Sequence, residues 1–261
     1  WFACWHGGLS RYRDDVAIVT VDPVQEVMAW GATGLSWASG AHVCRNTEAG
    51  VLREHVADQV NSMVLDRHGR MWIGTCYGGV WRREGAGSDD ALTLVLRLQP
   101  GGVMCLCEDR EGRMWVGTDD GALCHADGEW TTYTANDGLA DNQVSAILQD
   151  RHGHMWFGSN EGGGLTRYDG MSFETFSTAD GLVHDGVVAI SEDADGVLWI
   201  STHGGLSRYD GSTFENTAPG DGLLSSSVKR AFHDSAGRTW IATLGAGVHV
   251  MRGADMQVLT T

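Results

Sequence analysis

A tryptophan that follows a glycine by three residues recurs along the whole chain, and this repeat restricts the possible folds more than any other feature. The pairs are Gly34 and Trp37, Gly69 and Trp72, Gly112 and Trp115, Gly153 and Trp156, Gly196 and Trp199, and Gly237 and Trp240. Trp1 opens one further copy, and from it the successive tryptophans lie 36, 35, 43, 41, 43 and 41 residues apart. A period of roughly 40 residues is typical of the four-stranded blades of a β-propeller.

Each copy of the repeat also encodes a series of short strands and tight turns. In five copies an aspartate stands three residues before the glycine: Asp66, Asp109, Asp150, Asp193 and Asp234. An aspartate that bonds the backbone two residues on, followed by a glycine that tolerates positive φ, encodes a hairpin turn. Apolar runs precede and follow this turn, as at 145–148 and 71–75, and a glycine-rich turn leads to a third strand at 204–209. A Tyr-Asp-Gly turn at 209–211 then leads to a fourth strand.

We therefore predict an all-β fold, a seven-bladed β-propeller of four-stranded antiparallel blades that occupies residues 1–261 as a single domain. A lone blade buries its apolar faces poorly, so we expect the repeat tryptophans to be buried between neighbouring blades. Trp1 lies in the second strand of its blade and residues 256–261 read as a fourth strand, so one innermost strand is missing. We expect one incomplete blade, either three-stranded or completed by another part of a longer protein from which this chain is a segment.

The composition argues against two kinds of partner. The chain has 18 Lys and Arg against 34 Asp and Glu, a formal net charge of -16, so its surface repels nucleic acid. No stretch approaches the roughly 20 apolar residues of a membrane-spanning helix, so we expect no membrane insertion by this segment.

The six cysteines are too few and too scattered for a disulfide scaffold, and we expect buried free thiols.

The repeat resembles the two-component regulator propeller repeats of bacterial hybrid sensor kinases and related receptors. That family's pattern places D-x-x-G-x-[LM]-W-[IVF]-G-T before a glycine-rich turn, then G-L-x-R-Y, and D-G-L ahead of the next blade. Here the pattern is seen at 66–75, 109–118, 150–159 and 193–202, with Asp-Gly-Leu at 137–139, 180–182 and 221–223. The second copy, at residues 31–45, lacks the aspartate, the Gly-Thr and the following Gly-Leu, so its pairing as a full blade is an open question.

The resemblance implies a periplasmic or extracellular sensor domain joined to downstream signalling modules. It implies a small polar ligand, commonly a glycan fragment, and a binding role in place of catalysis. No cofactor is expected, and a divalent cation is compatible with the acidic composition. Any homodimer is expected to form through flanking regions.

A ligand site is expected on the loops at one end of the blades, because each blade sends two loops to the same rim. The loops between blades contain Asn142, Gln143, His184, Asp185, Ser225 and Ser226, and the loops between second and third strands contain Trp5, His6, Cys76, Tyr77, Asp119, Asp120, Asn160, Glu161 and His203. From these we predict a ligand-binding set of Trp5, His6, Tyr77, Asp119, Asp120, Asn142, Asn160, Glu161, His184, Asp185 and His203.

Some members of this set have two readings. Trp5 beside His6 suits stacking on a sugar face, but we favour the other reading, in which it fills a loop crevice. Asp119 and Asp120 suit a Ca²⁺ ion or simply a solvated turn.

The histidines divide into two groups by their place in the repeat. His184 and His203, with Glu161, form the sharpest chemical set, because imidazole and carboxylate groups can bind a metal or move a proton. His68, His152 and His154 lie in the D-x-x-G turns at the opposite end, and we interpret them as turn residues.

Three functions remain open from the sequence. The first is binding of a small polar ligand. The second is a metal-dependent lyase similar to the seven-bladed streptogramin lyases, although those favour Trp-Phe-Thr-Glu where this chain has Trp-Ile-Gly-Thr and Trp-Phe-Gly-Ser. The third is an interaction scaffold whose acidic rim docks a protein. The usual nucleotide, zinc and hydrolase motifs are not present in the sequence.

Overall fold

A computed structural model describes residues 2–4, 8–11, 17–18, 26–31, 34–39, 41–47, 50–56, 58–85, 91–99, 101–253 and 255–259. Within these residues the chain is almost entirely β, and its helical content is one turn of 3-10 helix, η1 (Thr178–Asp180). No helix in this part of the chain has the length and apolar character needed to span a membrane. The chain divides into two compact units, residues 1–108 and 109–261.

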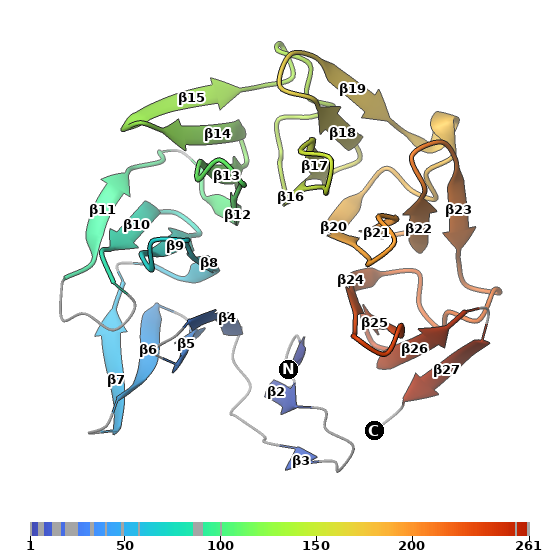
Figure 1. Ribbon diagram of the computed structural model, residues 1–261, viewed down its shortest axis with the longest axis horizontal. Helices are drawn as coiled ribbons and strands as arrows, with labels where there is room; N and C mark the ends of the chain where they lie inside the picture. The colour runs from blue at the N-terminus through green and yellow to red at the C-terminus, as the bar shows by residue number, and fades with distance from the viewer. Residues whose placement is uncertain are drawn as a thin grey trace. The chain divides into compact units, whose positions relative to one another are not determined.

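The strands follow one another in consecutive antiparallel sheets (Figure 1). The first sheet has three strands, β1 (Phe2–Cys4), β2 (Gly8–Arg11) and β3 (Ala17–Ile18). The second has β4 (Glu26–Gly31), β5 (Gly34–Ser39), β6 (His42–Thr47) and β7 (Gly50–His55), and the third has β8 (Val60–Leu65), β9 (Met71–Thr75), β10 (Gly79–Arg83) and β11 (Thr93–Leu96). The fourth has β12 (Val103–Glu108), β13 (Met114–Thr118), β14 (Gly121–Ala126) and β15 (Glu129–Tyr133).

Three further four-stranded sheets complete the second unit. They are formed by β16 (Ala146–Gln149), β17 (Met155–Ser159), β18 (Gly164–Tyr168) and β19 (Phe173–Phe176), by β20 (Val187–Glu192), β21 (Leu198–Thr202), β22 (Leu206–Tyr209) and β23 (Phe214–Thr217), and by β24 (Val228–His233), β25 (Thr239–Thr243), β26 (Val248–Arg252) and β27 (Asp255–Leu259). The first strand of each of these sheets is an edge strand, and the three lie next to one another, with β20 between β16 and β24 (Figure 1). The predicted all-β fold of four-stranded antiparallel sheets is confirmed, while closure into seven blades stays a prediction.

The second copy of the repeat forms a full sheet in spite of its divergent sequence. Strands β4 and β5 pair from Glu26 and Ser39 through to Gly31 and Gly34, so this hairpin closes without the D-x-x-G turn. The open question about its pairing is therefore answered by four strands in the order β4-β5-β6-β7. The first copy has three strands within the described residues, as expected for the incomplete blade.

The aspartate of each D-x-x-G turn binds the tryptophan of its own repeat, a contact that the sequence pattern alone does not reveal. Indole Nε1 donates to aspartate Oδ2 at 2.7–2.9 Å in the pairs Trp72 and Asp66, Trp115 and Asp109, Trp156 and Asp150, Trp199 and Asp193, and Trp240 and Asp234. The other carboxylate oxygen accepts backbone N–H groups two and four residues on, as from Asp195 and Val197 in the turn of Asp193. One carboxylate thus fixes both the turn and the ring that follows it.

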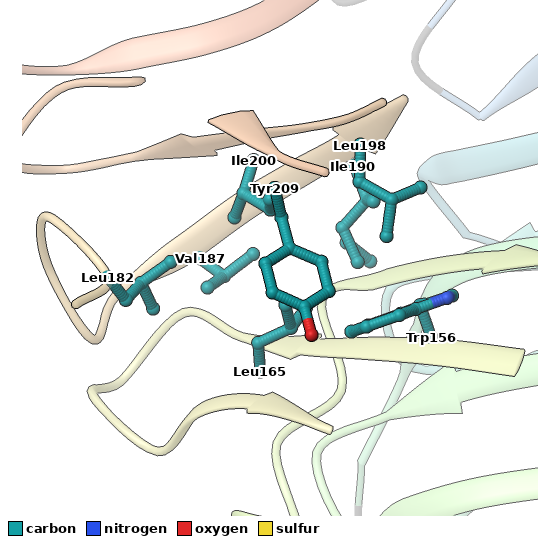
Figure 2. Close-up of a cluster of buried hydrophobic side chains, with 9 residues drawn as sticks. Trp156, Leu165, Leu182, Val187, Ile190, Leu198, Ile200 and Tyr209 are labelled. Carbon is teal, nitrogen blue, oxygen red and sulfur yellow. The ribbon is translucent and has the colours of Figure 1, made fainter. Parts of the chain in front are cut away.

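The repeat tryptophans are core residues. Trp72, Trp115, Trp156, Trp199 and Trp240 are each at most 6% exposed, which confirms the prediction for these five. Figure 2 shows the arrangement around Trp156, whose ring meets Tyr209 of the next sheet edge-on at 5.8 Å between centroids. Val187 and Ile200 of that next sheet pack in the same buried cluster.

Close approach between neighbouring sheets depends on the glycine that follows the tryptophan by two residues. A Cβ atom at Gly158 would lie 2.4 Å from Cγ1 of Val187, and one at Gly74 would lie 2.2 Å from Cγ1 of Val103. A side chain at either position would push the sheets apart, so these two glycines allow the close approach at these two places, whereas Ser201 and Ala242 stand at the equivalent positions after Trp199 and Trp240.

At the D-x-x-G end, an arginine of one turn binds the residue before the next aspartate. Arg67 donates from N and Nε to Glu108 at 2.9 Å, and Arg151 donates from Nε to Glu192 at 3.0 Å. The histidines assigned to these turns lie there, since His68 and His152 donate their backbone N–H groups to the turn carboxylates at 3.0 and 2.9 Å. Nδ1 of His154 lies 3.0 Å from Oδ2 of Asp150, where other copies place an arginine Nε.

The cysteines differ from the expectation of uniformly buried thiols. The described cysteine side chains form no disulfide, but only Cys124 among them is buried, and Cys76, Cys105 and Cys107 are half-buried. Cys76 follows β9 in a loop, while Cys105 and Cys107 lie on β12, most of whose residues are only partly covered. Burial raises the pKa of the Cys124 thiol to about 11, so it is protonated at neutral pH.

Replacement of a turn aspartate should be strongly destabilising. We expect Asp193→Ala to lower the free energy of unfolding by about 2–4 kcal/mol, because three N–H donors lose their shared acceptor. The matched control Asp195→Ala removes an exposed carboxylate from the same turn and should leave stability unchanged within error. Urea unfolding followed by tryptophan fluorescence measures both, and equal losses would contradict the role assigned to Asp193.

Acid should weaken the fold through the same carboxylates. Burial by itself raises the pKa of Asp193 and Asp234, but bonds from the indole and backbone outweigh it and lower both, that of Asp234 to about 2. A carboxylate with a depressed folded pKa stabilises above its unfolded pKa of about 3.9, and this contribution is lost as pH falls through the folded value. The free energy of unfolding should therefore drop between about pH 4 and pH 2 in a urea series, and a flat profile there would disprove the linkage.

Candidate ligand-binding rim

The rim loops of the second unit lie at the end opposite the D-x-x-G turns. We use this name for residues 119–120, 134–145, 160–163, 177–186, 203–205, 218–227 and 244–247, which join second to third strands or one sheet to the next. Consecutive strands in each sheet are antiparallel, so every second connection lies at the same end of the sheet. All the connections named above therefore lie at one end of their sheets. The prediction that second-to-third-strand loops and inter-sheet loops share an end is confirmed within this unit.

The Asp-Gly-Leu motif closes the turn that begins each long rim loop. Oδ2 of Asp137 accepts the backbone N–H and hydroxyl of Thr134 at 2.8 and 2.9 Å. Gly138 adopts φ 120° and leaves no room for a side chain, since a Cβ there would lie 2.7 Å from Cβ of Phe173. Leu139 is 4% exposed and anchors the loop in the core.

Each of these loops donates a backbone hydrogen bond to a buried side chain on the third strand of the following sheet. Backbone N–H groups donate to side chains in the pairs Ala140 and Thr166, Val183 and Ser207, and Leu224 and His249, at 2.9, 3.0 and 3.1 Å. Thr166, Ser207 and His249 are at most 1% exposed. Sequence reasoning missed these three residues, and the available signal was a polar residue at the same place in an otherwise apolar third strand.

Two of the predicted ligand residues hold their own loops in place. Oδ1 of Asn142 accepts the backbone N–H of Ala135 at 2.8 Å. The carboxylate of Asp185 accepts the N–H of Thr178 at 2.6 Å and its hydroxyl at 3.1 Å. Both side chains therefore shape the rim, and contact between them and a ligand stays a prediction.

Three other predicted residues come together at one place on the rim. Asn160 follows β17, His184 precedes β20, and His203 follows β21. Oδ1 of Asn160 lies 2.6 Å from Nε2 of His203. The rings of His184 and His203 are 6.2 Å apart between centroids and nearly perpendicular, at 89°. The site thus combines residues from three loops and two sheets.

Glycine is required where these loops meet. A Cβ atom at Gly186 would lie 2.9 Å from Cδ2 of His203 and 3.1 Å from both Nδ1 of His184 and the carbonyl oxygen of Asn160. A Cβ atom at Gly204 would lie 2.6 Å from Cβ of His184. The backbone passes so close to the polar side chains that no other residue fits without displacing them.

Hydrogen bonds assign the proton positions on the two imidazoles. Nδ1 of His184 accepts the N–H of Gly186 at 2.8 Å, so in the neutral ring the proton resides on Nε2. Nε2 of His203 donates to the amide oxygen of Asn160, so its Nδ1 keeps a lone pair. Burial, the nearby charge of Lys229 and that of His184 all lower the pKa of His203, so its ring is neutral at pH 7.

The remaining predicted residues do not join this group. Asp119, Asp120 and Glu161 are exposed on their own loops, and Tyr77, in the first unit, is 76% exposed. Trp5 and His6 lie outside the described residues. Among the residues that the structure describes, no three His, Cys, Asp or Glu side chains are grouped so that they could hold a metal ion.

The repeated turn of this fold is similar to that of the two-component regulator propeller repeat. The model of that repeat matches residues 56–77, 97–120, 138–161 and 181–204. The chain therefore carries two-component regulator propeller repeats at four places, and the resemblance seen in the sequence is confirmed.

Solved structures share the fold at low sequence identity. The extracellular domain of a putative hybrid two-component system from B. thetaiotaomicron is 21% identical with a TM-score of 0.76, over 87% of this chain and 32% of that one. This chain thus spans about a third of that structure's length. A catalytically inactive virginiamycin B lyase from Staphylococcus aureus, solved with quinupristin, is 12% identical with a TM-score of 0.72, over 90% of this chain and 83% of the lyase.

A gluconolactonase from Xanthomonas campestris is more distant, at 17% identity and a TM-score of 0.56 over 84% of this chain and 83% of that one. At these identities the likeness shows the fold alone. A comparison with curated protein sequences finds no match.

The environment of His203 leads to a testable titration. We expect its imidazole to titrate below the ordinary value of about 6.5, because burial, the charge of Lys229 and the neighbouring His184 disfavour its protonation. A pH series of NMR spectra measures the midpoint, and the spectrum of His203→Gln identifies the signal. A midpoint at or above the ordinary value would refute this view of the rim.

Proposed function

We propose that this chain is the sensing part of a two-component type receptor and binds a small polar ligand, such as a glycan fragment, on the rim around Asn160, His184 and His203. The observation that carries the proposal is the meeting of these side chains from three separate loops. A periplasmic or extracellular location belongs to the same proposal. It is supported by the repeat type and by the extracellular domain whose fold this chain shares.

The chemistry of the three side chains suits hydroxyl groups. His184 presents a donor at Nε2, and His203 presents an acceptor at Nδ1. A sugar hydroxyl both donates and accepts a hydrogen bond, so adjacent hydroxyls match this pair. The neutral imidazole of His203 also avoids the desolvation cost of burying a charge beneath a bound ligand.

The opposite end of the sheets offers a contrast. There the polar side chains bind one another, as Asp150 binds Trp156 and Arg151 binds Glu192. Those bonds stabilise the fold and explain why polar residues occur there. At the rim, the contact between Asn160 and His203 is not part of the repeat, because Cys76, Asp119 and Leu244 stand at the corresponding positions of other second-to-third-strand loops. Residues that the fold does not require are the better candidates for ligand contact.

Calorimetry with a panel of neutral and acidic mono- and disaccharides tests this function. We expect Asn160→Ala and His203→Ala each to weaken binding of a ligand from the panel by about tenfold or more, the effect of losing one good hydrogen bond. The matched control His152→Ala removes an exposed imidazole from a D-x-x-G turn and should leave affinity unchanged. Equal weakening by all three variants, or no binding by any saccharide, would disprove the proposal.

The same pair of imidazoles favours a catalytic alternative related to the lyase fold neighbour. His184 and His203 lie within 6.2 Å of each other, which is close enough for both to reach one substrate. Incubation of the protein with quinupristin, followed by mass spectrometry, distinguishes ligand binding from catalysis. Cleavage that is lost in His203→Ala would replace binding with catalysis as the function of this rim.

A further inference from the structure

The chain contains one lysine, Lys229, among 261 residues. It lies on β24 at a point where the pairing with β25 skips one residue, since Val228 pairs with Thr243 and Arg230 with Ala242. A β-bulge of this kind redirects the side chain of the extra residue. Bulges are common next to functional sites, where they aim a side chain.

The bulge recurs in the fold, but the lysine does not. The register shifts in the same way at Asn61 in β8 and at Val188 in β20. Nδ2 of Asn61 donates to the carbonyl of Val103 at 3.0 Å, which is a structural bond to the neighbouring strand. The same bulge therefore forms with Asn61 and with Val188 at the extra position. The fold does not require a cation at the equivalent position, Lys229.

Packing places the start of β24, which carries Lys229, beside the His203 loop. Val228 is fully buried in a cluster with Leu206, and Leu206 directly follows the turn that contains His203. Strand β24 also packs against β21, whose last residue precedes His203. The electrostatic influence of Lys229 on His203 agrees with this placement.

Lys229 therefore brings a fixed positive charge close to the two imidazoles, in a chain whose formal net charge is -16. An ammonium group attracts a small anion at short range. The acidic character of the whole chain repels polyanions, so a small ligand with a single negative charge fits better than a polymer. The hydrogen-bond donors and acceptors on His184, His203 and Asn160 complement hydroxyl groups on the same ligand.

We propose that Lys229, together with Asn160, His184 and His203, selects a small carboxylate-bearing sugar of the uronic acid class, with the lysine ammonium binding the carboxylate. This inference rests on the proposed function and specifies its ligand. The ammonium supplies a charge-assisted hydrogen bond, while the imidazoles and the amide bind the hydroxyls.

Calorimetry at pH 7.5 and low salt provides the test, with D-glucuronate and D-galacturonate compared with glucose, galactose and inorganic phosphate. We expect at least one of the acids to bind about tenfold more tightly than its neutral counterpart, the gain from one charge-assisted bond. Lys229→Gln should abolish this preference, and Lys229→Arg should retain it. The matched control Arg230→Gln removes the same charge from the neighbouring exposed position and should also retain it.

An NMR titration of His203 adds a readout that a purely structural lysine would not move. In the wild type, a bound carboxylate should raise the pKa of His203, because a nearby negative charge favours the imidazolium. Glucose or galactose should leave it unchanged. If Lys229→Gln does not fold, the salt dependence of wild-type binding replaces it, since only the preference for the acid should decline as salt is added.

The outcomes separate this inference from the function on which it rests. If a neutral sugar binds at Asn160 and His203 and the acids bind no better, the carboxylate inference is wrong and the proposed function stands. Tighter binding of phosphate than of either uronate would also overturn the carboxylate assignment. If no saccharide of either kind binds, both proposals fail.

Discussion

The bond between the turn aspartate and the indole of the same repeat organises this structure. A carboxylate that is partly or fully removed from water needs several donors to remain charged, and the turn supplies two backbone N–H groups while the tryptophan supplies a third. The tryptophan in turn fills the space between adjacent sheets, as Trp156 does against Tyr209. Local turn geometry and packing between sheets are thereby coupled in one interaction, repeated in five copies.

Hydrogen bonds within the protein hold the D-x-x-G turns at one end of the sheets. The residues of the rim loops at the opposite end can therefore differ from copy to copy. The rim loops are anchored by buried residues, such as Leu139 in the core and Thr166 beneath Ala140, so their tips can change without loss of the fold. Asn142 and Asp185 show the limit of this freedom, since both fix loop conformation. The polar group around His203 is formed on this rigid support, which limits the entropy lost when a ligand binds.

Much of the fold is predictable from local sequence, whereas the site is predictable only in part. Strands on either side of each D-x-x-G turn follow from residues within about ten positions of one another, and hairpins depend on such short-range signals. The divergent copy at 31–45 lacks this local signal, because its hairpin closes at Gly31 and Gly34 without that turn. The meeting of His184 and His203 was foreseen from their loops, but the bond from His203 to Asn160 and the place of Lys229 were not.

The sequence by itself determined the repeat, the order of strands and turns, and the burial of the tryptophans, because each depends on periodicity and on neighbouring residues. The tertiary structure decided which polar side chains are used internally and which converge on the rim. Asp185 and His203 look alike as polar loop residues, yet one binds Thr178 within its own loop and the other reaches Asn160 on the preceding sheet. That difference arises from how closely the sheets pack, which is set by contacts between residues some 40 positions apart.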